Sequence, residues 1–261
     1  MVYDYYPGCT IKNINSVYDK ELRAVSEALG ITLKELEDWQ CCGGVYPICA
    51  NETAQKLPSV RALHSALDNS GCLTTACSAC YHVLKSVNYD MKNNPAIRNK
   101  ANLYEEFEKP YMGETKVMHY LEILRDHIGF DNLKENVKTP LNKKIAAYYG
   151  CLLLRPSKIM AFDNAENPRI IEDFINALGG EAVVYPFRNE CCGGYISAED
   201  ESITEKRCKM IIDSAISHGA SEIVTACPLC LFNLKKYSPI HVKFFTELLC
   251  EALDCKLEAT V

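Results

Sequence analysis

The residues of this chain that could do chemistry are its cysteines, of which the 261-residue sequence has fifteen. Disulfide bonds explain them poorly, because the count is odd, no export signal precedes them and cytosolic thiols are kept reduced. Two of the cysteines are followed directly by another, at Cys41-Cys42 and Cys191-Cys192. Adjacent cysteines cannot reach relaxed disulfide geometry. Thiolates that hold a metal centre are the better interpretation.

Ten of the fifteen cysteines fall into one pattern that occurs twice. Each half has a single cysteine, then a Cys-Cys-Gly-Gly segment and then a CxxC motif. From Gly43 to Cys77 there are 33 intervening residues, and from Gly193 to Cys227 there are again 33. The chain is therefore interpreted as a tandem duplication. The repeated cysteines are Cys9, Cys41, Cys42, Cys77 and Cys80 in the first half and Cys151, Cys191, Cys192, Cys227 and Cys230 in the second.

Each half also alternates strand and helix signals, which predicts βαβ units and the α/β class, with a small, mostly parallel sheet in each half and flanking helices. Single cysteines and CxxC motifs directly follow predicted strands. Ligands of such sheets bind beyond the carboxyl ends of the strands, so we expect the cysteines of a half to converge at one edge. The predicted strands are 2–6, 31–36, 73–76, 144–149, 182–186 and 222–226, and the predicted helices are 16–29, 52–67, 81–89, 169–178, 202–217 and one from 229.

The repeat predicts two homologous domains related by pseudo-symmetry, at 1–135 and 143–261. Residues 118–129 resemble residues 243–254, with Glu122 matched to Glu247. The first half has extra residues, which we assign to a loop-rich insertion near 88–113 because this stretch is polar and contains prolines. The polar stretch 131–144 is the predicted linker.

Composition and charge limit the possible partners. A net charge of −6 and a pI near 5.6 argue against nucleic-acid binding, because there is no basic surplus to neutralise phosphates. The longest apolar run, 145–154, is too short to span a bilayer. The N-terminal residues lack the features of an export signal. We therefore expect a cytoplasmic protein without a membrane span.

The metal is not decided by ligand chemistry alone. A CxxC motif lets two sulfurs bind one centre, and the Gly-Gly pair allows backbone turns that other residues resist. Structural zinc takes four ligands, whereas each half offers five, and the same extra cysteine occurs in both halves. This favours iron–sulfur clusters and leaves zinc as the open alternative.

The doubled pattern, C-x31–39-CCG-x33–34-CxxC, resembles the CCG cysteine-rich domains of the B-subunit family of heterodisulfide reductases over nearly the whole chain. The resemblance implies one noncubane [4Fe-4S] cluster on five cysteines in each half. Carried over, one cluster uses Cys9, Cys41, Cys42, Cys77 and Cys80, and the other uses Cys151, Cys191, Cys192, Cys227 and Cys230.

The same resemblance implies a catalytic subunit of an oxidoreductase complex that reduces a disulfide of the CoM-S-S-CoB type at the clusters, with no side chain assigned to catalysis. It implies two partners in the same complex, namely a ferredoxin-like iron–sulfur subunit and a flavin-containing subunit, and no flavin or nucleotide on this chain. Two alternatives stay open. One is an electron-relay subunit of a related bacterial complex with another terminal acceptor. The other is a redox-inactive scaffold with zinc in one half.

The other candidate residues have plainer interpretations. We expect His82 to face solvent, Lys12 and Arg155 to be solvated or ion-paired, and Trp39 to pack over the first Cys-Cys loop. The remaining cysteines are expected to be core residues, since free cysteine is among the most buried residue types. These are Cys49, Cys72, Cys208, Cys250 and Cys255.

Overall fold

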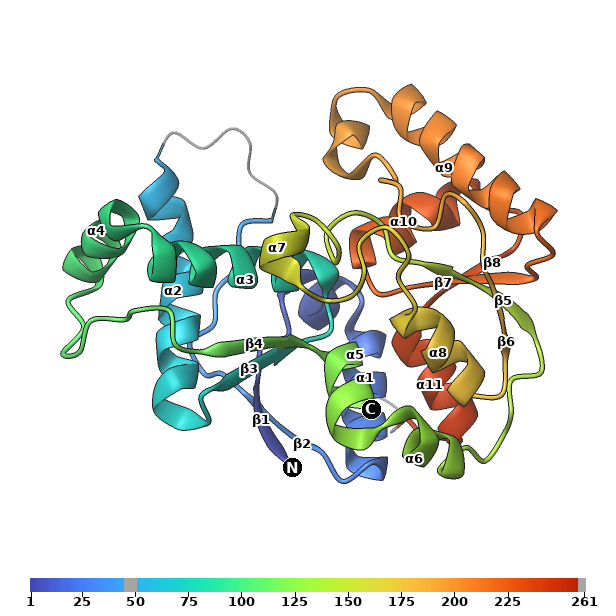
Figure 1. Ribbon diagram of the computed structural model, residues 1–261, viewed down its shortest axis with the longest axis horizontal. Helices are drawn as coiled ribbons and strands as arrows, with labels where there is room; N and C mark the ends of the chain where they lie inside the picture. Colours follow the sequence, from blue (N-terminus) through green and yellow to red (C-terminus); the bar gives the residue numbers. More distant parts are fainter. Residues whose placement is uncertain (45–50, 258–261) are drawn as a thin grey trace.

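The computed structural model of this chain describes residues 1–44 and 51–257 (Figure 1). The first half runs through β1 (Val2–Tyr5), η1 (Thr10–Ile14), α1 (Ser16–Ala28), β2 (Thr32–Glu35), α2 (Glu52–Asn69), β3 (Cys72–Thr75), α3 (Ser78–Asn93), α4 (Pro95–Glu105), β4 (Lys116–His119), α5 (Tyr120–Ile123), η2 (Leu124–Ile128) and α6 (Phe130–Glu135). The second half runs through β5 (Lys144–Tyr148), α7 (Ser157–Met160), α8 (Ile170–Ala177), β6 (Glu181–Val183), η3 (Gly194–Ala198), α9 (Glu201–Ser217), β7 (Glu222–Thr225), α10 (Pro228–Tyr237), β8 (His241–Phe244) and α11 (Phe245–Leu253).

Within the described ranges these strands form two four-stranded parallel sheets with the same strand order. The orders are β2-β1-β3-β4 and β6-β5-β7-β8. The predicted α/β class and the duplication are confirmed. The central strands β1 and β5 are buried apart from their first residues, as parallel strands covered on both faces should be. The edge strand β2 is only half-buried, which accounts for its Lys and Glu residues.

The insertion near 88–113 stays a prediction, but the expectation that it is loop-rich is wrong. Helix α3 continues to Asn93, and α4 fills residues 95–105. The Asn94 side chain accepts hydrogen bonds from the backbone N–H groups of Ala96 and Ile97, so it is the N-cap of α4. Pro95 occupies the first turn, where proline is favoured because its missing N–H needs no partner there. This proline begins a helix and does not mark a loop.

The resemblance between residues 118–129 and 243–254 has a physical basis. Both segments begin at the end of an edge strand, β4 or β8, which the sequence patterns did not predict. Both then turn directly into a helix. The Glu122 carboxylate accepts the backbone N–H of His119 at 2.7 Å, and Glu247 accepts that of Phe244 at 2.7 Å. The matched glutamates are thus helix caps. Helix α6 occupies the start of the predicted linker, and the domain limits stay a prediction.

The two halves pack against each other through elements that are distant in sequence. Helices α1 and α11 lie side by side at the centre of the molecule (Figure 1). Between them the Thr246 hydroxyl donates a hydrogen bond of 2.7 Å to the buried Glu21 carboxylate. On the other side of the junction, α3 contacts α7 and α10. There the Ser78 backbone N–H and hydroxyl both donate to the Ala226 carbonyl, at 3.1 and 2.7 Å.

The buried Glu21 predicts a pH-dependent junction. Burial, together with the nearby Glu247 carboxylate, raises the pKa of Glu21 to about 7, although Thr246 and Lys235 act in the opposite direction. An acid whose pKa is raised on folding stabilises the fold below its unfolded pKa, and this contribution is lost as the pH rises through the folded value. We expect the melting temperature of the wild type to fall relative to that of Glu21→Gln as the pH rises from about 5 to about 8.

The exposed Glu27, on the same helix, provides the control for this measurement. Melting curves of Glu27→Gln should follow those of the wild type at every pH. A constant difference in melting temperature between wild type and Glu21→Gln would contradict the raised pKa.

Candidate functional site

The cysteines of each half lie at the carboxyl ends of its strands, where the sequence placed them. We call the five of the first half the first cysteine set and those of the second half the second cysteine set. Cys9 follows β1, and Cys151 follows β5. Cys77 is the N-cap of α3 and Cys227 the N-cap of α10, so each CxxC motif opens a helix. At α10 the backbone N–H groups of Leu229 and Cys230 are hydrogen-bonded to the Cys227 side chain.

Within the first cysteine set the sulfurs form a connected series. Cys41 Sγ lies 3.4 Å from Cys9 Sγ, and Cys42 Sγ lies 3.7 Å from Cys80 Sγ. Cys41 and Cys42 are hydrogen-bonded through their side chains, as are Cys80 and Cys77. The structure thus brings together all five cysteines that the repeat singled out.

The second cysteine set has the same connections. Cys192 Sγ lies 3.6 Å from Cys230 Sγ. Cys191 is hydrogen-bonded to both Cys151 and Cys192, and Cys230 is hydrogen-bonded to Cys227. The order of contacts therefore matches that of the first set, sulfur for sulfur.

Glycines make this crowding possible. A Cβ placed on Gly8 would lie 2.6 Å from Cys80 Sγ, and one on Gly150 would lie 3.1 Å from Cys230 Sγ. Any larger residue before the single cysteine of a half would push the CxxC sulfur away. Gly193 has a φ of +101°, and its N–H donates to Cys191 Sγ at 3.4 Å. These glycines therefore supply both space and hydrogen bonds to sulfur.

The crowded thiols cannot all ionise unaided. Hydrogen bonds to neighbouring thiols, together with burial, raise the pKa of Cys80 and of Cys230 well above the usual range. At the other extreme, hydrogen bonds from Cys41 and Cys80 lower the pKa of Cys42 to about 3. Further thiolates would need a positive centre to balance their charge.

The donor set fits an iron–sulfur cluster. Its donors are soft sulfurs, the ligands that such clusters use, and backbone N–H groups point at them. Among residues 1–44 and 51–257 no three or more cysteine, histidine or acidic side chains are arranged to hold a single metal ion. An iron–sulfur cluster makes a different demand, because its thiolates bind different irons.

A buried tyrosine anchors each Cys-Cys segment. The Tyr6 hydroxyl donates to the carbonyl of Gln40, and the Tyr148 hydroxyl donates to that of Glu190 at 2.8 Å. In both halves the accepting residue directly precedes the Cys-Cys pair. Burial raises the pKa of both phenols, so each stays a protonated donor. The sequence patterns did not reveal this anchoring role.

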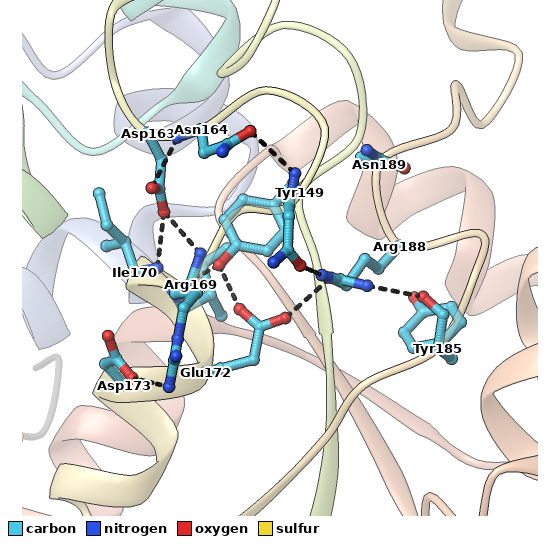
Figure 2. A network of polar contacts seen from close by, with 12 residues as sticks. Tyr149, Asp163, Asn164, Arg169, Ile170, Glu172, Asp173, Tyr185, Arg188 and Asn189 are labelled. Carbon is cyan, nitrogen blue, oxygen red and sulfur yellow. Dashed lines mark hydrogen bonds and ion pairs between the residues drawn. The ribbon is translucent and has the colours of Figure 1, made fainter.

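The second half has an additional clamp, drawn in Figure 2, between the segments that carry Cys151 and Cys191. The Nε of the buried Arg188 lies 3.0 Å from one carboxylate oxygen of Glu172, and the other carboxylate oxygen accepts the hydroxyl of Tyr149. The Arg188 carbonyl accepts the backbone N–H of Tyr149 at 2.8 Å. Because Tyr149 lies two residues before Cys151 and Arg188 three before Cys191, this ion pair ties the two segments together.

Three polar residues near the cysteine sets were given plain roles from the sequence, and two of these roles are confirmed. The prediction that His82 faces solvent is wrong, because α3 packs on the second half and the half-buried ring lies 3.2 Å from the Leu152 carbonyl. Lys12 and Arg155 are ion-paired, with Glu35 at 2.7 Å and Glu166 at 3.0 Å.

Trp39 packs edge-on against Tyr6 with ring centroids 5.6 Å apart, as expected of a residue beside the Cys-Cys loop. Cys208 and Cys250 are buried, Cys72 and Cys255 are half-buried, and Cys49 lies outside the described residues. The sequence reasoning missed Arg207 and Asn233, which contact the second cysteine set. Comparing the two halves position by position would have singled them out, because the first half has apolar residues there.

Comparison with known proteins identifies relatives of the whole arrangement. The CCG cysteine-rich domain family matches the chain twice, over residues 3–85 and 145–235. The 8-methylmenaquinol:fumarate reductase membrane anchor subunit of Wolinella succinogenes is 32% identical over 89% of this chain and 81% of its own length. The B subunit of the ferredoxin:CoB-CoM heterodisulfide reductase of Methanosarcina mazei is 29% identical over 92% of this chain and 82% of its own length.

A protein of Archaeoglobus profundus that is named for its likeness to the B subunits of heterodisulfide reductases is 30% identical over 89% of this chain and 80% of its own length. Among solved structures, a hypothetical protein from Helicobacter pylori superimposes with a TM-score of 0.73 at 14% identity. The superposition covers 98% of this chain and 49% of that one, and it supports the fold alone. In the part of the chain that the structure describes, no helix has the length and apolar character needed to cross a membrane.

The Arg188 clamp predicts a large cost for one substitution. Arg188→Met leaves the Glu172 carboxylate buried without its cation, which should lower the free energy of unfolding by about 3–5 kcal/mol. Urea denaturation of the anaerobic protein measures this. The control is Arg169→Met, which removes an exposed pair with Asp173 at 3.7 Å and should cost about 0–1 kcal/mol. Equal losses in the two variants would contradict the role given to the clamp.

Proposed function

Since this chain belongs to the CCG cysteine-rich domain family, and within it to the B-subunit family of heterodisulfide reductases, we propose that it is the iron–sulfur catalytic subunit of an oxidoreductase complex. Each cysteine set holds one noncubane [4Fe-4S] cluster in this proposal. The observation that carries it is the repetition of one five-sulfur arrangement on both sides of a single junction.

The reaction that suits this arrangement best is the reduction of a disulfide of the CoM-S-S-CoB type. Cleaving the S–S bond takes two electrons and two protons and yields two thiols. The five cysteines of each set would hold one cluster, and a cluster bound there would supply one of the two electrons. Relatives named as the B subunits of CoB-CoM heterodisulfide reductases support this class of substrate.

The contacts between the halves support a substrate site that both sets share. Ser78, which follows Cys77, is hydrogen-bonded to Ala226, which precedes Cys227. The CxxC motifs are thereby held next to each other. A Cβ on Gly44 would lie 2.5 Å from the Tyr195 hydroxyl, so the two Cys-Cys-Gly-Gly segments also approach across the junction. A disulfide bound there would have one cysteine set on each side.

The electrons must come from partner subunits. The sequence has no G-x-G-x-x-G or P-loop motif for a nucleotide or flavin cofactor. We therefore propose a complex with a ferredoxin-like iron–sulfur subunit and a flavin-containing subunit, as the kinship with heterodisulfide reductases suggests. The cytoplasmic location of this complex is part of the same proposal.

A second function is favoured by one specific observation. The Wolinella succinogenes relative, at 32% identity, is named as a subunit of a fumarate reductase. The electron acceptor in that name is fumarate, which is not a disulfide. The same two cysteine sets would then form an electron relay. If the reaction takes place at both clusters, turnover needs each of them. If the clusters form a relay, turnover can continue after one of them is lost.

The cofactor is tested by iron content. We expect about eight irons and eight sulfides per chain after anaerobic purification. Cys42→Ser and Cys192→Ser each replace a soft sulfur by a harder oxygen, so each should lose or convert one cluster and leave the EPR signal of the other unchanged. Cys255→Ser, at a half-buried position outside both sets, should keep all the iron. Stoichiometric zinc with little iron would contradict the proposal and support the zinc scaffold.

The reaction is tested by turnover in the assembled complex. If a disulfide is cleaved between two clusters, Cys42→Ser and Cys192→Ser should each reduce heterodisulfide reduction at least a hundredfold while the other cluster survives. A relay can end at the nearer cluster, so it predicts that one of the two variants keeps substantial activity. Full turnover by Cys192→Ser with its cluster absent would exclude the two-cluster reaction.

A further inference from the structure

The two halves can be compared residue by residue around their cysteine sets. Cys41, Cys42, Cys77 and Cys80 correspond to Cys191, Cys192, Cys227 and Cys230 at a constant offset of 150 positions, because 191 − 41 and 230 − 80 are both 150. No gap interrupts the match between residues 41–83 and 191–233. Any difference in this stretch is therefore a difference between equivalent positions.

One such difference places a hydrogen-bond donor at a cysteine sulfur. The Asn233 amide nitrogen lies 3.5 Å from Cys192 Sγ and 3.2 Å from the Gly194 carbonyl. The residue at the equivalent position of the first half is Val83, which has no donor. Both side chains are 2% exposed, so water does not replace the missing donor at Val83.

Two further side chains of the second half donate hydrogen bonds beside its cysteines, although to their carbonyl oxygens and not to sulfur. Arg207 Nε donates to the Cys191 carbonyl at 2.7 Å, and the Cys208 thiol donates to the Cys192 carbonyl at 3.4 Å. Their counterparts in the first half are Leu57 and Pro58, whose side chains can donate nothing. The Arg207 charge is partly balanced by Glu190 at 3.6 Å, and Asn233 is therefore the main contributor.

The backbone donors do not distinguish the sets. In the second set the N–H groups of Gly193 and Gly194 donate to Cys191 and Cys192. In the first set Gly43 and Gly44 make the corresponding hydrogen bonds to Cys41 and Cys42. These contributions cancel in the comparison. The first set has one side-chain hydroxyl at a sulfur, since Thr10 Oγ1 lies 3.8 Å from Cys9 Sγ where the second half has Leu152. This contact is longer than that of Asn233 and only partly buried, so the Asn233 amide has the larger effect.

Donors near sulfur change the redox property of a cluster. Reduction adds negative charge to a cluster and its thiolates, so hydrogen bonds to the sulfurs and nearby cations raise the reduction potential. Exposure to water also raises the reduction potential. This effect favours the first set, because Cys41 is exposed whereas its counterpart Cys191 is half-buried. We give the Asn233 amide more weight, because a dipole in a buried site is screened far less than one in water.

We propose that the second cysteine set holds its cluster at a higher reduction potential than the first, and that the Asn233 amide is the residue that sets this difference. The proposal rests on the proposed function only in requiring a cluster on each set. At equilibrium a single electron then resides on the second cluster at least ten times as often as on the first, which corresponds to a difference in reduction potential of 59 mV for a one-electron couple.

The test exchanges the residues at the two equivalent positions. Anaerobic redox titration of the full chain, followed by EPR, gives two midpoint potentials, and the Cys42→Ser and Cys192→Ser spectra assign them. In Asn233→Val we expect the higher potential to fall so that the tenfold preference is lost. In Val83→Asn we expect the lower potential to rise. Asn88→Val removes an amide that donates to the Thr115 carbonyl in the first half, and it should leave both potentials unchanged.

Iron content separates this inference from the proposed function. Equal potentials in a wild type with a full iron complement, or an unchanged higher potential in iron-replete Asn233→Val, would overturn the inference alone. If Asn233→Val loses its iron, the test rests on Val83→Asn. An unchanged lower potential in that variant would also overturn the inference. A wild type without iron–sulfur clusters would overturn the proposed function itself.

Discussion

The structure depends on one electrostatic constraint, namely that five thiols are held in near contact at a largely buried place. Such an arrangement is unfavourable without compensation, because like charges in a poorly screened site repel each other strongly. The chain provides compensation from its backbone. Gly193 and Gly194 direct N–H groups at sulfur, and α3 and α10 begin at cysteines. The carboxyl edge of a parallel sheet suits this purpose, because several strands there end close to the N-termini of helices.

Duplication explains both the likeness of the halves and their differences. The connections between sulfurs, the tyrosine anchors at Gln40 and Glu190, and the glutamate caps occur in both. The Arg188–Glu172 clamp lies in the second half, and there Tyr149 stands where the first half has Pro7. Once each copy could hold its cysteine set, the surroundings of the two sets were free to diverge.

Sequence patterns predicted the features that depend on repetition and periodicity. The spacing of the cysteines predicted which side chains converge, and the alternation of strands and helices predicted the parallel sheets. The patterns failed where a residue has two uses. Pro95 breaks a helix interior but starts a helix when Asn94 caps it, and the short strands β4 and β8 are recognisable only through their pairing. His82 was misplaced because periodicity within one half does not reveal what the other half covers.

The bond between Ser78 and Ala226 also constrains how the protein is made. The ribosome builds the first half completely before the second exists, and the two residues are 148 positions apart. The hydroxyl of Ser78, beside Cys77, acquires its partner only after synthesis has passed residue 226 of 261. The first cysteine set therefore reaches its final form late in synthesis, although its own residues are made first. Assembly of the first site is completed by folding of the second half, and a nascent chain that stalls between the halves lacks the Ala226 carbonyl that holds Ser78.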